Sequence, residues 1–222
     1  MAVYKAVIFD LDGTLLNTLD DLAFAVNLTM DHFGAPRRTV GEVRDFVGNG
    51  AAKLIERAMP AGTPESVLDE ATRLYKKLYF ENMLRDTAPY PGVPEMLSAL
   101  RARGIKTAVA SNKYRRSTES LCEMFFPMID CAVGEDEACG IKRKPSPDML
   151  LDAMKRFGVK AEETVFVGDS EVDIQTAAAA GVRCISVSWG YCDRDFLIEN
   201  GAAFMAEQPD DILMFIDSAH RD

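Results

Sequence analysis

Two aspartates one residue apart, Asp10 and Asp12, are the residues of this sequence best suited to perform chemistry. They stand in the run Asp-Leu-Asp-Gly-Thr at residues 10–14. A carboxylate such as that of Asp10 can attack phosphorus and form an aspartyl-phosphate. Asp12 can protonate the leaving alkoxide and later take a proton from the hydrolytic water. Gly13, which precedes Thr14, lets the chain turn sharply at this point.

Two further segments carry groups that a phosphate ester would need during such an attack. The charge of a phosphate dianion opposes an anionic nucleophile, so a cation and a lysine must neutralise it. Lys144, which precedes a proline, can balance the charge of the nucleophile and of the phosphoryl group. Ser111, which is followed by Asn112, can donate a hydrogen bond to a phosphate oxygen. The predicted catalytic residues are therefore Asp10, Asp12, Ser111 and Lys144.

A fourth segment supplies more carboxylates. Asp169 and Asp173 lie in the run GDSEVD at residues 168–173. If they meet Asp10, three carboxylates share one place and repel one another unless a cation is bound. Oxygen ligands with partial hydration suit Mg²⁺. The sequence therefore predicts a magnesium site, although acids at these positions could also serve only to stabilise a helix N-terminus.

The elements that must position these residues are predicted to be alternating strands and helices. Short apolar runs indicate buried strands at Val3–Phe9, Ile105–Ala110, Thr164–Val167 and Cys184–Val187. Caps and breakers indicate helices at Val93–Arg103, at Glu171–Ala180, and from an N-cap at Ser146, with Pro147 as the first helical residue, to Gly158. This alternation predicts an α/β fold with a Rossmann-like parallel sheet and helices on both faces. Ligands bind beyond the carboxyl ends of the strands in such sheets, which is where the four segments fall.

The spacing of the first two strands predicts an inserted helical cap. A β-α-β unit needs only about 30 residues, yet about a hundred residues separate these strands. The intervening sequence indicates helices at Leu19–Phe33, after a Thr39–Glu42 capping box, and from Thr63-Pro64 to Leu84. We expect a cap domain at residues 16–85 and a core at residues 1–15 and 86–222, with 86–92 as the return linker.

Composition excludes several classes of function. Hydrophobic residues make up 48% and charged residues 27%, as in ordinary globular proteins. Lys and Arg total 25 and Asp and Glu total 35, so the net charge is −10. Such a chain repels nucleic acid and anionic lipid, and no apolar run approaches a membrane span. An anionic substrate would need a local positive site or a metal.

Cysteine and histidine usage argues against zinc and disulfide frameworks. The five cysteines form no C-x-x-C pair, and only His32 and His220 are present. Scattered thiols of this kind, including Cys139, are typical of the reducing cytoplasm, and we expect them to act as small buried hydrophobic residues. No signal peptide is recognised. We therefore expect a cytoplasmic protein, a monomer or homodimer, that acts on a small phosphorylated metabolite.

These residues, in this order, closely resemble the haloacid dehalogenase-like hydrolase superfamily, whose four motifs match DLDGT, SN, KP and GDSEVD. The resemblance implies that Asp10 is the nucleophile and Asp12 the acid and base. It implies a metal held by the Asp10 carboxylate, the Asp12 backbone carbonyl and Asp169, with Asp173 as a ligand or a support. Dehalogenase members lack the second acid, so Asp12 favours phosphoryl transfer. Expected substrate contacts near these motifs are Gly13, Thr14 and Asn112.

A glycine-rich segment of the expected cap is the candidate for substrate selection. Free backbone N–H groups at a helix N-terminus bind anions, and VGNGAAKLIERA resembles the cap segment of phosphoglycolate phosphatases. We predict that a second anionic group, such as a carboxylate, docks there, and the candidate residues are Gly48, Asn49, Gly50, Lys53 and Arg57. A plain glycine-rich helix junction is the alternative.

Several other activities remain open from the sequence. A phosphomutase of the β-phosphoglucomutase type, a pyrophosphatase and a nucleotidase would use the same residues. A phosphonoacetaldehyde hydrolase would need a Schiff-base lysine, for which Lys53 is the candidate. A catalytically silent metal- or phosphate-binding regulatory protein is the non-enzyme alternative, although both Asp10 and Asp12 are intact.

Overall fold

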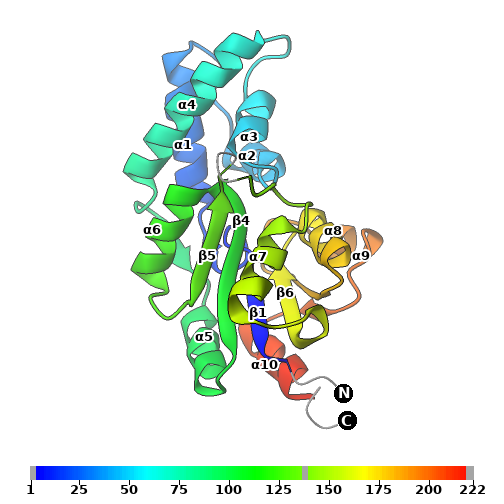
Figure 1. Ribbon diagram of the computed structural model, residues 1–222. Helices are drawn as coiled ribbons and strands as arrows, with labels where there is room; N and C mark the ends of the chain where they lie inside the picture. Colours follow the sequence, from blue (N-terminus) through cyan, green and yellow to red (C-terminus); the bar gives the residue numbers. More distant parts are fainter. Residues whose placement is uncertain (1–3, 137–139, 219–222) are drawn as a thin grey trace.

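A six-stranded parallel sheet forms the centre of the molecule (Figure 1). The computed structural model describes residues 4–136 and 140–218. The strand order is β5-β4-β1-β6-β7-β8, and every hydrogen-bonded pair is parallel. The strands are β1 (Ala6–Phe9), β4 (Lys106–Tyr114), β5 (Cys131–Glu135), β6 (Thr164–Gly168), β7 (Arg183–Val187) and β8 (Met205–Ala206). The predicted α/β class is confirmed, and all four predicted strands are present.

Helices cover both faces of the sheet because its side chains alternate between them. Val7 and Phe9 of β1 pack with α5 (Val93–Ala102), α6 (Arg115–Phe125) and α10 (Pro209–Ser218). Ile8 packs on the other face with α7 (Asp148–Phe157) and α8 (Glu171–Ala180). A 3₁₀ helix (Ala161–Glu163) and α9 (Arg194–Glu199) complete this part of the chain. All three side chains are fully buried, so β1 lies at the centre of both apolar layers.

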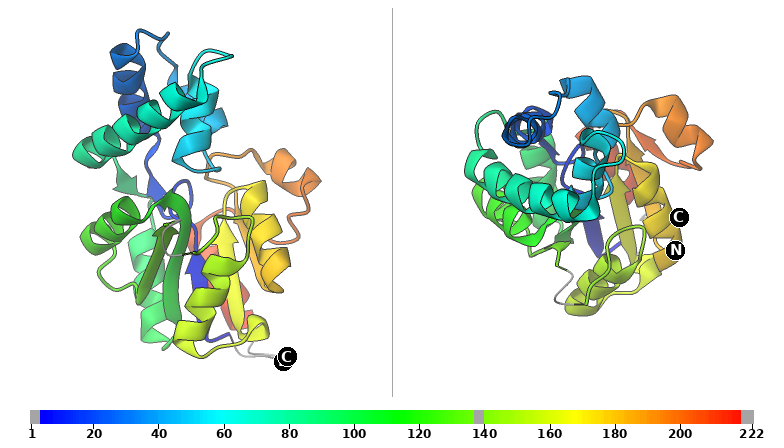
Figure 2. Two further views of the ribbon diagram at one scale, coloured as in Figure 1. Left: turned by 45° about the horizontal axis from the view of Figure 1, so that its top comes forward. Right: turned by 90° about the horizontal axis from the view of Figure 1, so that it is seen from above.

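Four helices between the first two predicted strands form a separate layer, which we name the four-helix unit. They are α1 (Leu19–His32), α2 (Val40–Phe46), α3 (Ala51–Ala58) and α4 (Glu65–Asn82). Helix α4 packs against both α1 and α3. Figures 1 and 2 show the unit beyond the carboxyl ends of the central strands, at the opposite end from the chain termini. The unit therefore lies over the sheet edge where the four motifs meet.

The two crossings between the sheet and the four-helix unit lie side by side. The outgoing segment forms β2 (Leu16–Asn17), and the returning segment forms β3 (Ala88–Pro89). These strands pair antiparallel, with Leu16 opposite Pro89. The return segment 86–92 is thus more than a linker, because it holds the base of the unit in register.

Local capping signals account for most helix ends. The Thr39 hydroxyl accepts from the Glu42 N–H at 3.2 Å, and the Thr39 N–H donates to the Glu42 carboxylate at 2.8 Å, which confirms the predicted capping box. Helix α7 differs from its prediction by one residue, since Pro147 is the N-cap. The Ser146 hydroxyl donates to the Asp148 carboxylate at 2.7 Å, and within the described residues no side chain caps this helix.

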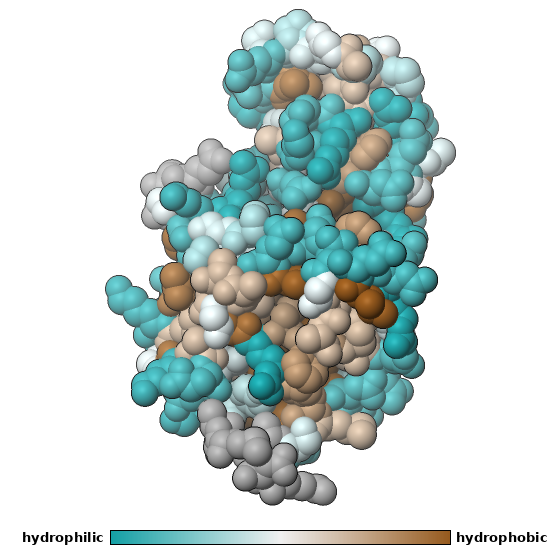
Figure 3. Space-filling model, turned by 90° about the vertical axis from the view of Figure 1, so that its right-hand side faces the viewer, coloured by the Kyte–Doolittle hydropathy of each residue, from teal (hydrophilic) through white to brown (hydrophobic). Residues whose placement is uncertain are grey.

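The remaining sequence predictions concern membrane spans and the burial of the cysteines. Among the described helices, none is both long and apolar enough to cross a membrane. Cys122 is buried, while Cys131, Cys184 and Cys192 are half-buried thiols; Cys139 and His220 lie outside the described residues. Figure 3 shows one side of the molecule, where a narrower and largely hydrophilic lobe rises above a broader body in which apolar residues are visible.

Candidate active site

The central position of β1 brings three of the four motifs to one edge of the sheet. Phe9, the last residue of β1, pairs with Val109 of β4 and with Val167 of β6. The next residue, Asp10, donates its N–H to the Val167 carbonyl at 2.8 Å. Ser111 and Asp169 follow the two partner residues at the same edge. Parallel pairing therefore places these side chains together, as the sequence predicts.

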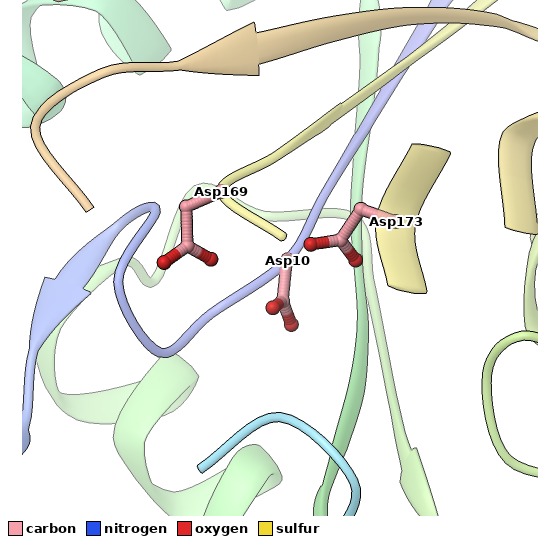
Figure 4. A group of neighbouring side chains, drawn as sticks. All are labelled: Asp10, Asp169 and Asp173. Carbon is pink, nitrogen blue, oxygen red and sulfur yellow. The ribbon is translucent and has the colours of Figure 1, made fainter. Parts of the chain in front are cut away.

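Three aspartate carboxylates converge at this edge. Oxygen atoms of Asp10, Asp169 and Asp173 all lie within 4.8 Å of one another, and all three residues are buried. Asp173 comes from the first turn of α8, whereas Asp10 and Asp169 directly follow strands. Figure 4 shows the three carboxylates pointing toward a common space. These three carboxylates could together hold a cation.

Lys144 stands among these carboxylates with its ammonium group buried. Its Nζ lies 2.7 Å from Asp173 Oδ1 and 2.9 Å from Asp10 Oδ1. Burial by itself would lower the pKa of Lys144. The negative charges of Asp10 and Asp173 raise this pKa by more than burial lowers it, so the net shift is upward. The lysine therefore stays protonated next to the predicted nucleophile.

The charge of the cluster fits a divalent cation. Burial raises the pKa of Asp10 to about 6, with Lys144 opposing this shift and Asp173 and Asp12 adding to it. Burial and the neighbouring charges of Asp173 and Asp10 raise the pKa of Asp169 well above its usual value. When all three carboxylates are ionised, they and the Lys144 ammonium together carry a charge of −2. An oxygen-rich site with this charge suits Mg²⁺ or a similar hard cation.

The carboxylates of Asp169 and Asp173 differ in how many of their oxygens are engaged. Asp173 Oδ1 accepts from Lys144, and Oδ2 accepts from the N–H and hydroxyl of Ser170 at 3.1 and 2.6 Å. Asp169 Oδ2 accepts from the Tyr191 N–H at 2.7 Å, while Oδ1 has a longer contact of 3.4 Å with the Thr14 hydroxyl. Asp169 thus keeps an oxygen for a metal, whereas Asp173 caps α8 and orients Lys144.

Two glycines give Asp169 the room it occupies. A Cβ at Gly13, whose φ is +82°, would lie 2.1 Å from Asp169 Oδ2. A Cβ at Gly190 would lie 2.2 Å from the Asp169 Cβ. Gly13 and Thr14, expected as substrate contacts, therefore face a carboxylate of the cluster. Gly190 and Tyr191 were missed, because nothing local in the sequence relates the loop after β7 to Asp169.

Asp12 is held on both of its carboxylate oxygens. Its Oδ1 accepts from the Thr18 hydroxyl at 2.7 Å, and its Oδ2 lies 2.7 Å from the Lys113 Nζ. Only 4% of the Lys113 side chain is exposed. Sequence reasoning missed this lysine, although it directly follows Ser111 and Asn112 and the motif could have been extended by one residue.

Asn112 links parts of the site instead of facing an open space. Its amide nitrogen donates to the carbonyl oxygens of Lys144 and Gly48, each at 3.0 Å. Its amide oxygen accepts from the Lys144 N–H at 2.8 Å. The predicted substrate contact is therefore a joint between the Lys144 loop and the four-helix unit.

A cavity of about 80 Å³ lies between the sheet edge and the four-helix unit. Its walls from the sheet side include Asp10, Asp12, Ser111 and Lys113. The four-helix unit adds aromatic, aliphatic, cationic and glycine residues, among them Arg44, Gly48, Gly50, Leu54, Tyr75, Lys76 and Tyr79. Arg44, Lys76 and Lys113 supply the local positive charge that an anionic ligand of a chain with net charge −10 requires.

The predicted cap contacts divide between this cavity and a second, more open pocket. Gly48 and Gly50 line the cavity beside Asp10, and Gly50 caps α3. Asn49, Lys53 and Arg57 line the second pocket, together with Lys144. Lys53 pairs with Glu56 at 2.7 Å, and Arg57 donates to the Phe46 carbonyl at 2.8 Å. The structure therefore brings only the glycines to the side of the predicted nucleophile.

Comparison with known proteins agrees with this geometry. The family model for haloacid dehalogenase-like hydrolases matches residues 7–187. The phosphoglycolate phosphatase of Pseudomonas syringae pv. tomato is 38% identical over 197 residues, which cover 84% of this chain and 70% of that protein. The phosphoglycolate phosphatase of Nitrosospira multiformis is 38% identical over 193 residues, which cover 84% of each chain.

Solved structures are similar over almost the whole chain. A provisionally assigned phosphoglycolate phosphatase from Lactobacillus delbrueckii subsp. bulgaricus has a TM-score of 0.91 at 33% identity and covers 96% of this chain and 98% of its own. CbbY from Rhodobacter sphaeroides, in complex with phosphate, has a TM-score of 0.78 at 26% identity and covers 94% and 96%. The similarity includes the four-helix unit as well as the sheet.

Proposed function

The chain belongs to the haloacid dehalogenase-like hydrolase family and is a phosphoric monoester hydrolase, and we propose that it cleaves a small phosphomonoester through a phosphoryl group carried on Asp10. The observation that carries this proposal is the buried Asp10 carboxylate, 2.9 Å from the Lys144 ammonium, at the floor of a small cavity. The lysine stabilises the negative charge that gathers when a carboxylate meets a phosphate.

The side chains around Asp10 divide the reaction into two steps. Asp10 attacks phosphorus, the ester oxygen leaves, and Asp12 gives that oxygen its proton. Asp12 then takes a proton from a water molecule, which attacks the aspartyl-phosphate and releases inorganic phosphate. The buried Ser111 hydroxyl donates to a phosphoryl oxygen. Thr18 and Lys113 keep the Asp12 carboxylate in one orientation between these events.

A divalent cation, most simply Mg²⁺, would be held by Asp10, by Asp169 Oδ1 and by the Asp12 backbone carbonyl. Its chemistry would be to polarise the phosphoryl oxygens and to offset the charge of the nucleophile. Asp173 would support this site from behind by fixing Lys144 and the start of α8, because both of its oxygens already accept hydrogen bonds.

Phosphoglycolate is the proposed first substrate. The relatives named phosphoglycolate phosphatase support this substrate. The size of the cavity supports it as well, because about 80 Å³ is far below the ~300–1,000 Å³ of sites for drug-sized ligands. The glycine segment before α3 lines the cavity, and cationic residues surround it. A substrate with a phosphate and one more anionic group on a two-carbon unit matches these features.

Phosphate release from a substrate panel tests this proposal. The panel contains phosphoglycolate, sugar phosphates, nucleoside monophosphates and pyrophosphate, with Mg²⁺ present and Asp10→Asn as the blank. A kcat/KM for phosphoglycolate far above the rest supports the proposal. A different leading ester would contradict the substrate, and the absence of release from every ester would contradict the reaction.

A further inference from the structure

Lys113 connects the predicted acid and base to the four-helix unit. Its ammonium lies 2.7 Å from Asp12 Oδ2 and 4.3 Å from the centre of the Tyr79 ring on α4. Both side chains line the cavity that contains Asp10. The Lys113 ammonium therefore lies between a carboxylate and an aromatic face, where a second anion in the cavity could bind to it.

Tyr79 has a hydroxyl group that the described residues leave unused. The residue is 3% exposed, and its oxygen has no hydrogen-bond partner in the described part of the chain. Burial raises the pKa of Tyr79, so the hydroxyl keeps its proton and is available as a donor. A buried polar atom without a partner is costly to folding. The hydroxyl oxygen is enclosed, but Tyr79 lines the cavity, so a small movement of its ring on ligand binding would give this hydroxyl a partner.

The positions of the Lys113 ammonium and the Tyr79 hydroxyl relative to Asp12 indicate which part of a substrate they would contact. Asp12 must lie within hydrogen-bonding reach of the ester oxygen that it protonates. Lys113 contacts that same carboxylate, so it lies close to the atoms bonded to the ester oxygen. The phosphoryl group itself is directed toward Asp10 and Lys144, on the side of the metal cluster.

We propose that Lys113 and Tyr79 form a carboxylate subsite, which selects phosphomonoesters whose ester-bearing carbon also carries a carboxylate. This inference rests on the proposed function. It assigns residues to the carboxylate of the substrate, which the phosphate-binding residues do not contact. The ammonium pairs with the carboxylate, and the Tyr79 hydroxyl donates to one of its oxygens. The ring of Tyr75, stacked 6.0 Å from that of Tyr79, also lines the cavity.

The test compares phosphoglycolate with ethyl phosphate, in which a methyl group replaces the carboxylate. The readout is the ratio of the two kcat/KM values. Lys113→Met is expected to lower this ratio about 100-fold, since truncating one partner of a buried charge pair has effects of this order. Lys113→Arg should retain much of the ratio. Tyr79→Phe, which keeps the ring, should lower it about fivefold. Lys77→Met, at an exposed position on the same helix, should leave both kcat/KM values unchanged.

Binding to the Asp10→Asn variant separates failure of this inference from failure of the proposed function. Calorimetry should show phosphoglycolate binding more tightly than ethyl phosphate, with the difference lost when Lys113→Met is added. Equal losses on both esters would make Lys113 a positioning residue for Asp12 and overturn the subsite, as would an unchanged ratio. If no ester is turned over, the proposed function fails, and the calorimetric difference alone then decides the subsite.

Discussion

The Asn112 side chain donates a hydrogen bond to the Gly48 carbonyl oxygen at 3.0 Å, and so joins the strand that carries Ser111 to the four-helix unit. The same amide holds the backbone of Lys144 on both its N–H and its carbonyl oxygen. One side chain thus connects the strand that carries Ser111, the lysine that pairs with Asp10, and the glycine segment that lines the cavity. The positions of the glycine segment and of the Lys144 backbone therefore depend on the same amide.

Replacing Asn112 with alanine should therefore weaken both stability and turnover. The change leaves the buried Lys144 N–H without its partner, which costs about 1–3 kcal/mol. Denaturant unfolding should show a lower free energy, and kcat should fall because Lys144 is less well placed. Asn200→Ala, which removes one exposed hydrogen bond, is the control and should change neither quantity by much. An Asn112→Ala enzyme with wild-type stability would contradict the role of this amide as a joint.

Asp10→Asn should abolish turnover and leave the fold intact. An amide is a poor nucleophile, so a loss of at least about 10⁴-fold in kcat is expected for removal of a group of this kind. The substitution also removes one of three crowded negative charges, so the thermal midpoint should not fall sharply. Circular dichroism and phosphate release check the two halves of this prediction. A purified variant that retains most of its activity would show that Asp10 is not the nucleophile.

Removal of divalent metal should stop turnover reversibly and lower thermal stability. With all three carboxylates ionised, the cluster and Lys144 carry a charge of −2 that a bound divalent cation would neutralise. At about 100 times its Kd, a cation that binds only the folded state adds about 2.7 kcal/mol of stability. Thermal melts with EDTA and then with excess Mg²⁺ measure this difference. Asp169→Asn should reduce the Mg²⁺-dependent shift, and activity that persists without divalent metal would contradict the metal site.

Gly190→Ala should displace the Asp169 carboxylate without changing the charge of the site. The new Cβ would lie 2.2 Å from the Asp169 Cβ and 2.6 Å from the Gly13 carbonyl oxygen, so the carboxylate must move. We expect loss of the Mg²⁺-dependent thermal shift and a large drop in kcat. Gly41→Ala is the matched control, because Gly41 lies in α2 with open space around its Cβ position. That variant should be more stable by about 0.5–1 kcal/mol, as expected for glycine to alanine within a helix.

Much of the fold follows from local patterns in this chain. The helix Glu171–Ala180 was predicted with its observed ends, because Gly181 adopts the left-handed conformation there, with φ of +67°. Strands β5 and β8 were not predicted, because β8 has only two residues and β5 ends in a Gly-Glu pair without an extended β-branched run. These strands form because they hydrogen-bond to neighbouring strands of the sheet. A local sequence pattern contains no information about which strands those neighbours are.

The sequence by itself determined that Asp10, Ser111 and Asp169 meet, because parallel strands must present their carboxyl ends at one edge of a sheet. Only the tertiary structure decided what surrounds them. Gly190 makes room for Asp169, Tyr79 faces Lys113, and Asn112 joins Lys144 to Gly48, through contacts between residues that lie 21 to 64 positions apart. Such contacts depend on how helices and loops pack over the sheet. Strand periodicity fixes which residues reach the edge, whereas packing fixes which of their atoms are left free to bind a ligand.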